Sequence, residues 1–123
     1  MATQNTRVLV SLVADSAING QYLAVKLGAS DNSVVLASAG TDAILGIVEN
    51  KPLAGEGASV AISGIAKFTA GAAVALGAQV TSDANGKLVT ATTGDIVIGR
   101  CVQAAGAEDE IGAVLLTVPY VSL

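Results

Sequence analysis

The amino-acid sequence predicts an all-β protein, either a compact antiparallel β-barrel or a β-sandwich. Short Val, Ile and Leu runs alternate with turn residues roughly every eight to twelve positions, a spacing typical of antiparallel sheets rather than of helices. Hydrophobic residues make up 52% of the chain and aromatic residues only 2%, so the apolar mass is nearly all Ala, Val, Ile and Leu. A core of such small side chains gains little from burial alone, so we expect a binding partner to add stability.

Residues 1–6 are polar and have nothing to bury, so we expect a flexible N-terminal arm that either frays or adds to a neighbouring subunit. Residues 7–123 are expected to form a single β-barrel domain, because 123 residues fit one compact core. Apolar runs between turn residues place the first strands at residues 7–14, 22–28, 33–37 and 43–48.

The next strand is expected at residues 58–68, and its alternation changes within the strand. Its large side chains are Val60, Ile62, Ile65 and Phe68, and the period of two breaks at Gly64. The break predicts a β-bulge at which the strand switches faces.

Residues 69–77, with the sequence TAGAAVALG, are predicted to form a short helical corner between two strands. Their Ala and Leu residues favour a helical turn, and Gly71 and Gly77 suit its boundaries. A helix of at most two turns needs packing on the sheet to be stable. The longest apolar stretch of the chain lies here and is about half of the ~20 residues that span a bilayer, so no membrane anchor is expected.

Asn85-Gly86, in TSDANGKLVT, is the best local turn signal of the sequence. Both residues can adopt positive φ and close a two-residue turn between antiparallel strands. This signal predicts a hairpin of strands at residues 78–81 and 87–90. Two apolar runs then place the last strands at residues 95–102 and 111–118.

The two halves of the chain resemble each other, because residues 30–48 align without gaps on residues 83–101. The alignment predicts an internal pseudo-duplication, with the turn, an aspartate and a strand glycine in register. The alternative is that any β protein with evenly spaced strands produces such a match. The identical pairs are Asn32 with Asn85, Asp42 with Asp95, and Gly46 with Gly99.

The chain offers little for catalysis, and we expect neither an enzyme nor a cofactor or metal site. It has no His, the usual general base and metal ligand, and its only Cys, Cys101, sits in an apolar run that is typical of a buried small hydrophobe. Most aspartates stand in turn contexts, where capping of the backbone is the ordinary role. The acidic run at residues 108–110 could hold a cation weakly, but more simply it solvates a hairpin loop.

Charge argues against a nucleic-acid partner. The formal net charge is −4, the pI is 4.4, and the six cationic residues are scattered singly. The sequence has no stripe of basic residues that could follow a phosphate backbone. The N-terminal region also lacks the pattern of a secretion signal.

Three residues are candidates for contact with a protein partner: Arg7, Phe68 and Tyr120. Large rings contribute disproportionately to interfaces, and Tyr120 follows Pro119 near the end of the given sequence, where a core role is less natural. For Phe68 the alternative is that it fills the core. A ligand pocket in the barrel is disfavoured, because such pockets recruit aromatic walls that this chain lacks.

Residues 43–118 carry an ordered set of loose motifs built from small residues. An apolar-Gly-Val strand is followed by an Ala/Gly loop, a strand ending in Ser-Gly, an Ala-rich segment, a Val strand into Asp-Ala-Asn-Gly-Lys, a second apolar-Gly strand and a final Val/Leu strand. The order of these motifs resembles that of the small capsid decoration, or cement, proteins of tailed bacteriophages.

The resemblance implies a β-barrel on the outer surface of the phage capsid, made in the host cytoplasm and bound to the major capsid protein as a homo-trimer. It implies no catalytic residues. Two other functions stay open from the residues: another β module of the virion, such as a head-fibre base or a tail-associated part, or a barrel that binds carbohydrate or a small ligand.

Overall fold

The structure is a computed structural model that describes residues 7–122, with the side chain of Arg7 excepted. The predicted N-terminal arm therefore lies outside the described residues. The described chain is all-β, as expected, and each predicted strand is present. The strands are β1 (Arg7–Ala14), β2 (Leu23–Leu27), β3 (Ser33–Leu36), β4 (Ile44–Val48), β5 (Gly57–Thr69), β6 (Gln79–Ser82), β7 (Leu88–Thr90), β8 (Ile96–Gln103) and β9 (Ile111–Val121).

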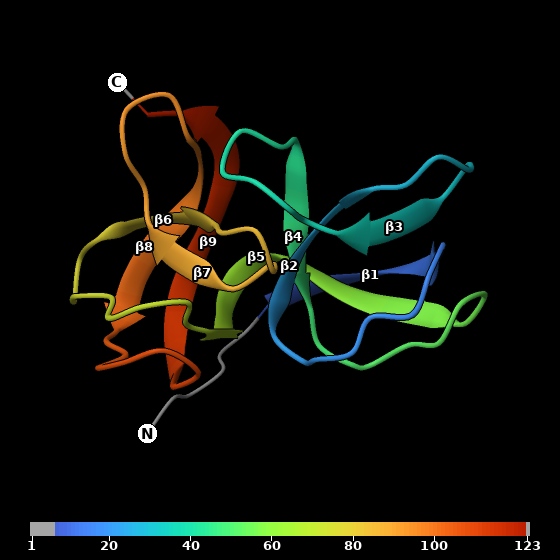
Figure 1. Cartoon of the computed structure of the whole chain (residues 1–123), viewed down its shortest axis with the longest axis horizontal. Helices are drawn as coiled ribbons and strands as arrows, with labels where there is room; N and C mark the ends of the chain where they lie inside the picture. Colours follow the sequence, from blue (N-terminus) through green and yellow to red (C-terminus); the bar gives the residue numbers. More distant parts are fainter. Residues whose placement is uncertain (1–6, 123) are drawn as a thin grey trace.

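Five of the strands close into a barrel. Their order is β1-β3-β2-β4-β5, and pairing of β1 with β5 completes the ring. The predicted antiparallel architecture has one parallel exception, β1 with β3, where Val13 pairs with Ser33. Strand β2 lies between them in the sequence, and such a crossover is what a parallel pair requires. In Figure 1 the barrel occupies the right half of the molecule.

Strand β5 is shared between the barrel and a second sheet of order β5-β9-β8-β6-β7. The first part of β5 pairs with β1 and β4, and residues 64–69 pair with β9. Gly64 has φ of 87°, and the register against β1 shifts between Val8 and Leu9, which leaves Ile62 unpaired on that side. The strand therefore has a bulge and switches faces as predicted, but the bulged residue is Ile62 rather than Gly64, which pairs with Arg7. Ile62 packs on the core inside the barrel, whereas Phe68 packs in a second core.

Two hydrophobic cores result. The barrel core fills the inside of the barrel, and the second core lies between the second sheet and the outside of β2 and β4. Neighbouring residues alternate between the cores, as with Ala24 and Val25, so that β4 and residues 23–25 of β2 are buried on both faces. The barrel core includes Ile18, Leu23, Val25, Val34, Val48 and Val60, and the second core includes Ala24, Ile44, Ile47, Phe68, Leu88, Ile98, Val114 and Leu116.

The β6–β7 hairpin forms where the turn signal places it, but with a different turn. Only Gly86 has positive φ, at 76°, while Asn85 does not. The carboxylate of Asp83 accepts hydrogen bonds from the backbone N–H groups of Asn85 at 2.8 Å and Lys87 at 3.0 Å, which stabilises a longer turn than the expected two residues. Gly86 is needed on packing grounds too, since a Cβ there would overlap Leu36 of the barrel.

The helical corner at residues 69–77 is a wrong prediction, because the described residues contain no helix. The backbone donors of this segment bond to other segments instead, and sheet pairing outweighs the weak helix preference of so short a stretch. These bonds join Ala70 N to Glu110 O at 2.9 Å, Gly71 N to Leu88 O at 2.8 Å and Val74 N to Ala105 O at 2.8 Å. No membrane-crossing helix is present in residues 7–122.

The predicted repeat is present as a repeated strand arrangement. The order β3-β2-β4-β5 in the barrel recurs as β7-β6-β8-β9 in the second sheet. The turns before β4 and β8 match in detail: Ala39 N donates to Asp42 Oδ2 at 3.1 Å, and Thr92 N donates to Asp95 Oδ2 at 2.9 Å. The structure therefore supports a repeat of the whole supersecondary unit, beyond the regular spacing of strands.

Candidate functional site

Most carboxylates of the chain cap turns, which is the role expected from their sequence contexts. Asp15 Oδ2 accepts a hydrogen bond from Ala29 N at 2.9 Å, and Asp42 Oδ2 accepts from Ser38 N at 2.8 Å. Backbone hydrogen bonds from Ala29 and Ser38 are the main reason that the pKa of each carboxyl lies below its ordinary value. These two groups hold loops in place.

Acid is expected to destabilise the fold through Asp15 and Asp42. Because both pKa values are lower in the folded chain than the ordinary 3.8, the stabilisation is complete above that value and is lost as pH falls toward the folded-state pKa. Thermal melts between about pH 5 and pH 2.5 should show a falling Tm. In the double variant Asp15→Asn/Asp42→Asn the loss of Tm over this interval should be smaller. An equal loss would contradict this assignment.

The acidic run at residues 108–110 is engaged by a cation of the chain itself. Lys87 Nζ lies 2.6 Å from Asp109 Oδ1 and 3.4 Å from Glu108 Oε2, and these contacts raise the pKa of Lys87. Glu110 Oε1 accepts a hydrogen bond from Gly106 N at 2.8 Å. Among the described residues no cluster of side chains suits a metal ion. The run therefore ties the β8–β9 loop to the β6–β7 hairpin.

Cys101 is buried in the second core, where its thiol donates to the carbonyl of Gln103 at 3.2 Å. Burial raises the pKa of this thiol, so the reactive thiolate form is disfavoured. The side chain acts as a small hydrophobe, as the sequence suggests.

A pocket of about 370 Å³ lies between the barrel and the β6–β7 hairpin. Asn19, Gln21, Asn85 and Lys87 contribute polar groups, and Leu23 and Leu36 contribute apolar surface. No aromatic side chain lines it. The pocket lies outside the barrel, whose interior is filled by the barrel core.

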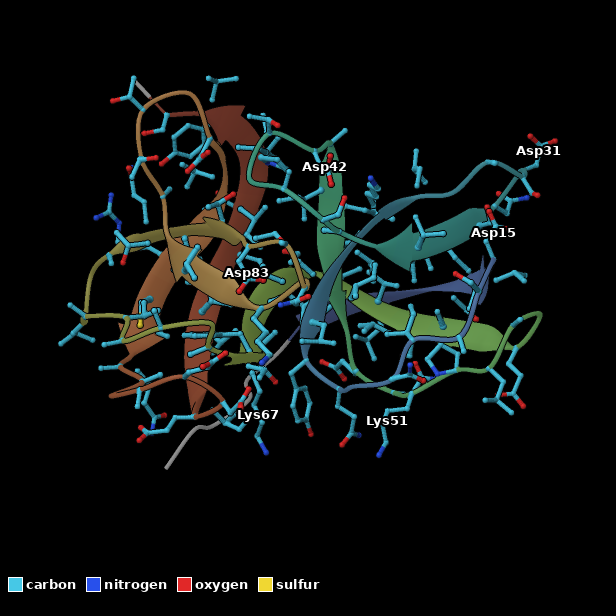
Figure 2. All side chains as sticks on the ribbon, in the orientation of Figure 1. Asp15, Asp31, Asp42, Lys51, Lys67 and Asp83 are labelled. Atoms are coloured by element: carbon cyan, nitrogen blue, oxygen red, sulfur yellow. The ribbon has the colours of Figure 1, made fainter. Side chains whose placement is uncertain are left out.

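Charge is segregated between strands and loops. None of the ten Asp and Glu residues lies within a strand, whereas four of the six cations do, namely Arg7, Lys26, Lys67 and Arg100. Figure 2 shows Asp15 and Asp31 at the end of the barrel that is remote from the second sheet, and Lys67 pointing outward at the lower edge. Lys26 is neutralised by Asp42, with 3.1 Å between Nζ and Oδ2. Negative charge therefore lies in the loops, together with Lys51 and Lys87, whereas the other four cationic residues occupy strand positions.

The outer face of the second sheet combines these cations with exposed apolar groups. Strand pairing sets Ile65 and Arg100 on either side of Leu115, so the three side chains share one face, opposite Val114 in the second core. Leu115 is 43% exposed, and Val102 beside Arg100 is 40% exposed. We call this surface the sheet face; it comprises Ile65, Lys67, Arg100, Val102, Leu115 and Tyr120.

The structure places the three candidate contact residues differently. Tyr120 is 44% exposed, and its hydroxyl accepts a hydrogen bond from Gln79 Nε2 at 2.6 Å, which holds the ring on the sheet face. Phe68 is fully buried in the second core, which is the alternative role, so it is not available to a partner in this structure. Arg7 begins β1 opposite Gly64, and its side chain lies outside the described part of the structure.

Leu115, Arg100 and Val102 were not among the candidates from sequence. Each lies in an apolar strand whose partner strand and register are unknown from the sequence, so their common face could not be recognised. The only available signal was a single Arg within the run IVIGRCV. A lone cation inside a buried strand indicates an outward-facing position.

Comparison with known proteins places the chain among phage structural proteins. A family model described as phage cement protein matches residues 4–116. Among solved structures, the head fibre gp8.5 N base of bacteriophage phi29 has a similar fold, with a TM-score of 0.71 and 17% sequence identity over 96% of this chain and 98% of that chain. No curated protein matches the chain by sequence.

Proposed function

The chain belongs to the phage cement protein family, and on that premise we propose that it decorates the outside of a phage head. It binds the capsid and stabilises contacts between subunits of the major capsid protein. The observation that carries the proposal is the family match over residues 4–116, which spans the barrel and most of the second sheet. The protein acts by adhesion and catalyses no reaction.

The physical properties of the chain suit this role. Many copies that each add a modest contact free energy to a closed shell act together, so weak individual binding is sufficient. A homo-trimer would complete the small-residue cores through subunit contacts. Carboxylates at the loops would face solvent outside the capsid, away from the packaged DNA, so no nucleic-acid contact is needed.

The test is to add purified protein to undecorated, expanded phage heads and measure bound protein by co-sedimentation. We expect saturable binding and a greater resistance of decorated heads to heat. Light scattering of the free protein should give three times the 12.0 kDa chain mass. Binding that does not saturate, or that is absent, would refute the decoration role.

A second candidate is the base of a head fibre, favoured by the fold shared with the phi29 head fibre N base over nearly the whole of both chains. In that role the described domain would attach a projecting segment to the capsid. Electron microscopy of the particle separates the two, since a decoration protein covers many lattice positions as compact density and a fibre base carries a projection.

A further inference from the structure

We propose that the sheet face is the surface that docks on the capsid, and that it recognises an apolar patch of the shell that bears carboxylates. This inference rests on the proposed function and names the surface and the chemistry of its partner. It is carried by the charges, exposure and strand register of the second sheet.

The cations of the sheet face lack carboxylate partners among the described residues. Within residues 7–122, neither Lys67 nor Arg100 forms a salt bridge, although Lys26 and Lys87 do. Lys67 Nζ lies 5.7 Å from the centre of the Tyr22 ring, and Arg100 Nη1 donates to Gly77 O at 2.9 Å. Both charges thus keep donor capacity for groups from another molecule.

The sheet face combines cations and a tyrosine with aliphatic side chains. Arg100 stands between the exposed side chains of Leu115 and Val102, and Tyr120 is fixed nearby by its bond to Gln79. Arg and Tyr beside apolar side chains are the groups that contribute most binding free energy at protein interfaces. A carboxylate that meets Arg100 in such a setting would be shielded from water by the apolar neighbours.

The distribution of charge also favours one docking orientation. With its carboxylates at the loops, the chain would be repelled from an acidic shell surface in every pose that presents a loop. The sheet face reverses this sign, because it carries Lys67 and Arg100 without a salt bridge, whereas Lys26 on the barrel is paired with Asp42. The charge pattern would therefore select one docking orientation before close contact forms.

A second copy of the chain is a weaker partner for this face. Its carboxylates are largely engaged: Asp15, Asp42, Asp83 and Asp95 cap backbone turns, and Asp109 pairs with Lys87. Releasing one of them to meet Arg100 would expose backbone donors that it now satisfies.

The test compares Leu115→Glu and Leu27→Glu, which add the same charge at exposed strand positions, one on the sheet face and one at 61% exposure on the barrel. Binding to undecorated heads is measured by co-sedimentation at low and high salt, and circular dichroism verifies folding. We expect Leu115→Glu to weaken binding about tenfold or more at 0.05 M salt, and Leu27→Glu to change it by less than about twofold. Arg100→Gln should weaken binding and flatten its salt dependence.

The outcomes separate the two proposals. If the unmodified chain does not bind heads, the decoration role fails and the docking face fails with it. If the unmodified chain binds and both Leu115→Glu and Arg100→Gln bind equally well, the docking face is refuted while the decoration role stands. If these variants instead lower the mass of the free protein by light scattering, the face joins subunits, and the proposed capsid contact is also refuted.

Discussion

Replacing Phe68 with Ala should lower the free energy of unfolding by about 3–5 kcal/mol. Phe68 is the only Phe of the chain and is fully buried where β5 meets the second core. Truncation removes its transfer free energy and leaves a cavity that the surrounding small side chains cannot fill. Urea unfolding followed by circular dichroism measures the change.

A milder substitution keeps this prediction testable if Phe68→Ala does not fold. Phe68→Leu retains most of the volume and should cost less than about 1.5 kcal/mol. The matched surface control is Val118→Ala on β9, where the side chain is 85% exposed and the change should stay within about 0.5 kcal/mol. A loss for Phe68→Ala no larger than for Val118→Ala would contradict the assignment of Phe68 to the core.

Gly99→Ala should also lower the free energy of unfolding, although it adds a single methyl group. A Cβ at Gly99 would overlap the carbonyl oxygen of Leu115 on the neighbouring strand β9 and a methyl of Val114. Because the obstacle is backbone, the sheet must shift, and overpacking of this kind costs about 1–3 kcal/mol or more. The repeat predicts the same effect for Gly46→Ala, whose Cβ would overlap the carbonyl oxygen of Ala61.

The control for these substitutions is Gly57→Ala at the start of β5. A Cβ at Gly57 meets only the hydroxyl of Ser11, at 3.8 Å, so the change should be neutral or slightly stabilising. Thermal melts of the three variants give the comparison. If Gly99→Ala and Gly57→Ala have the same Tm, the close strand contact at Gly99 is not a packing constraint.

The strands could be predicted from sequence because each is a short apolar run between turn residues, and the bulge because Gly64 breaks the alternation. The conformation of the segment at residues 69–77 could not be predicted in this way. Its Ala content describes a local preference, whereas its conformation is set by carbonyls of β7 and the β8–β9 loop, far away in the sequence. The prediction of a two-residue turn at Asn85 was wrong because the carboxylate of Asp83 accepts hydrogen bonds from Asn85 and Lys87 and so stabilises a longer turn.

The candidate site was harder to predict. The capping role of the aspartates follows from residue type and local context. The sheet face depends on which strands pair and in what register, and these relations connect Ile65 to Leu115 and Leu115 to Arg100 across long stretches of chain. Tyr120 was identifiable from its size and position, but the partners that hold it were not.

The thirteen residues of β5 run through both cores as one uninterrupted backbone. Because β5 belongs to both, a force applied to the second sheet passes along the backbone of this strand into the barrel. On heating, the barrel and the second sheet should therefore unfold together and give a single calorimetric peak. The barrel and the second sheet therefore form one mechanical unit, with no hinge in the strand that joins them.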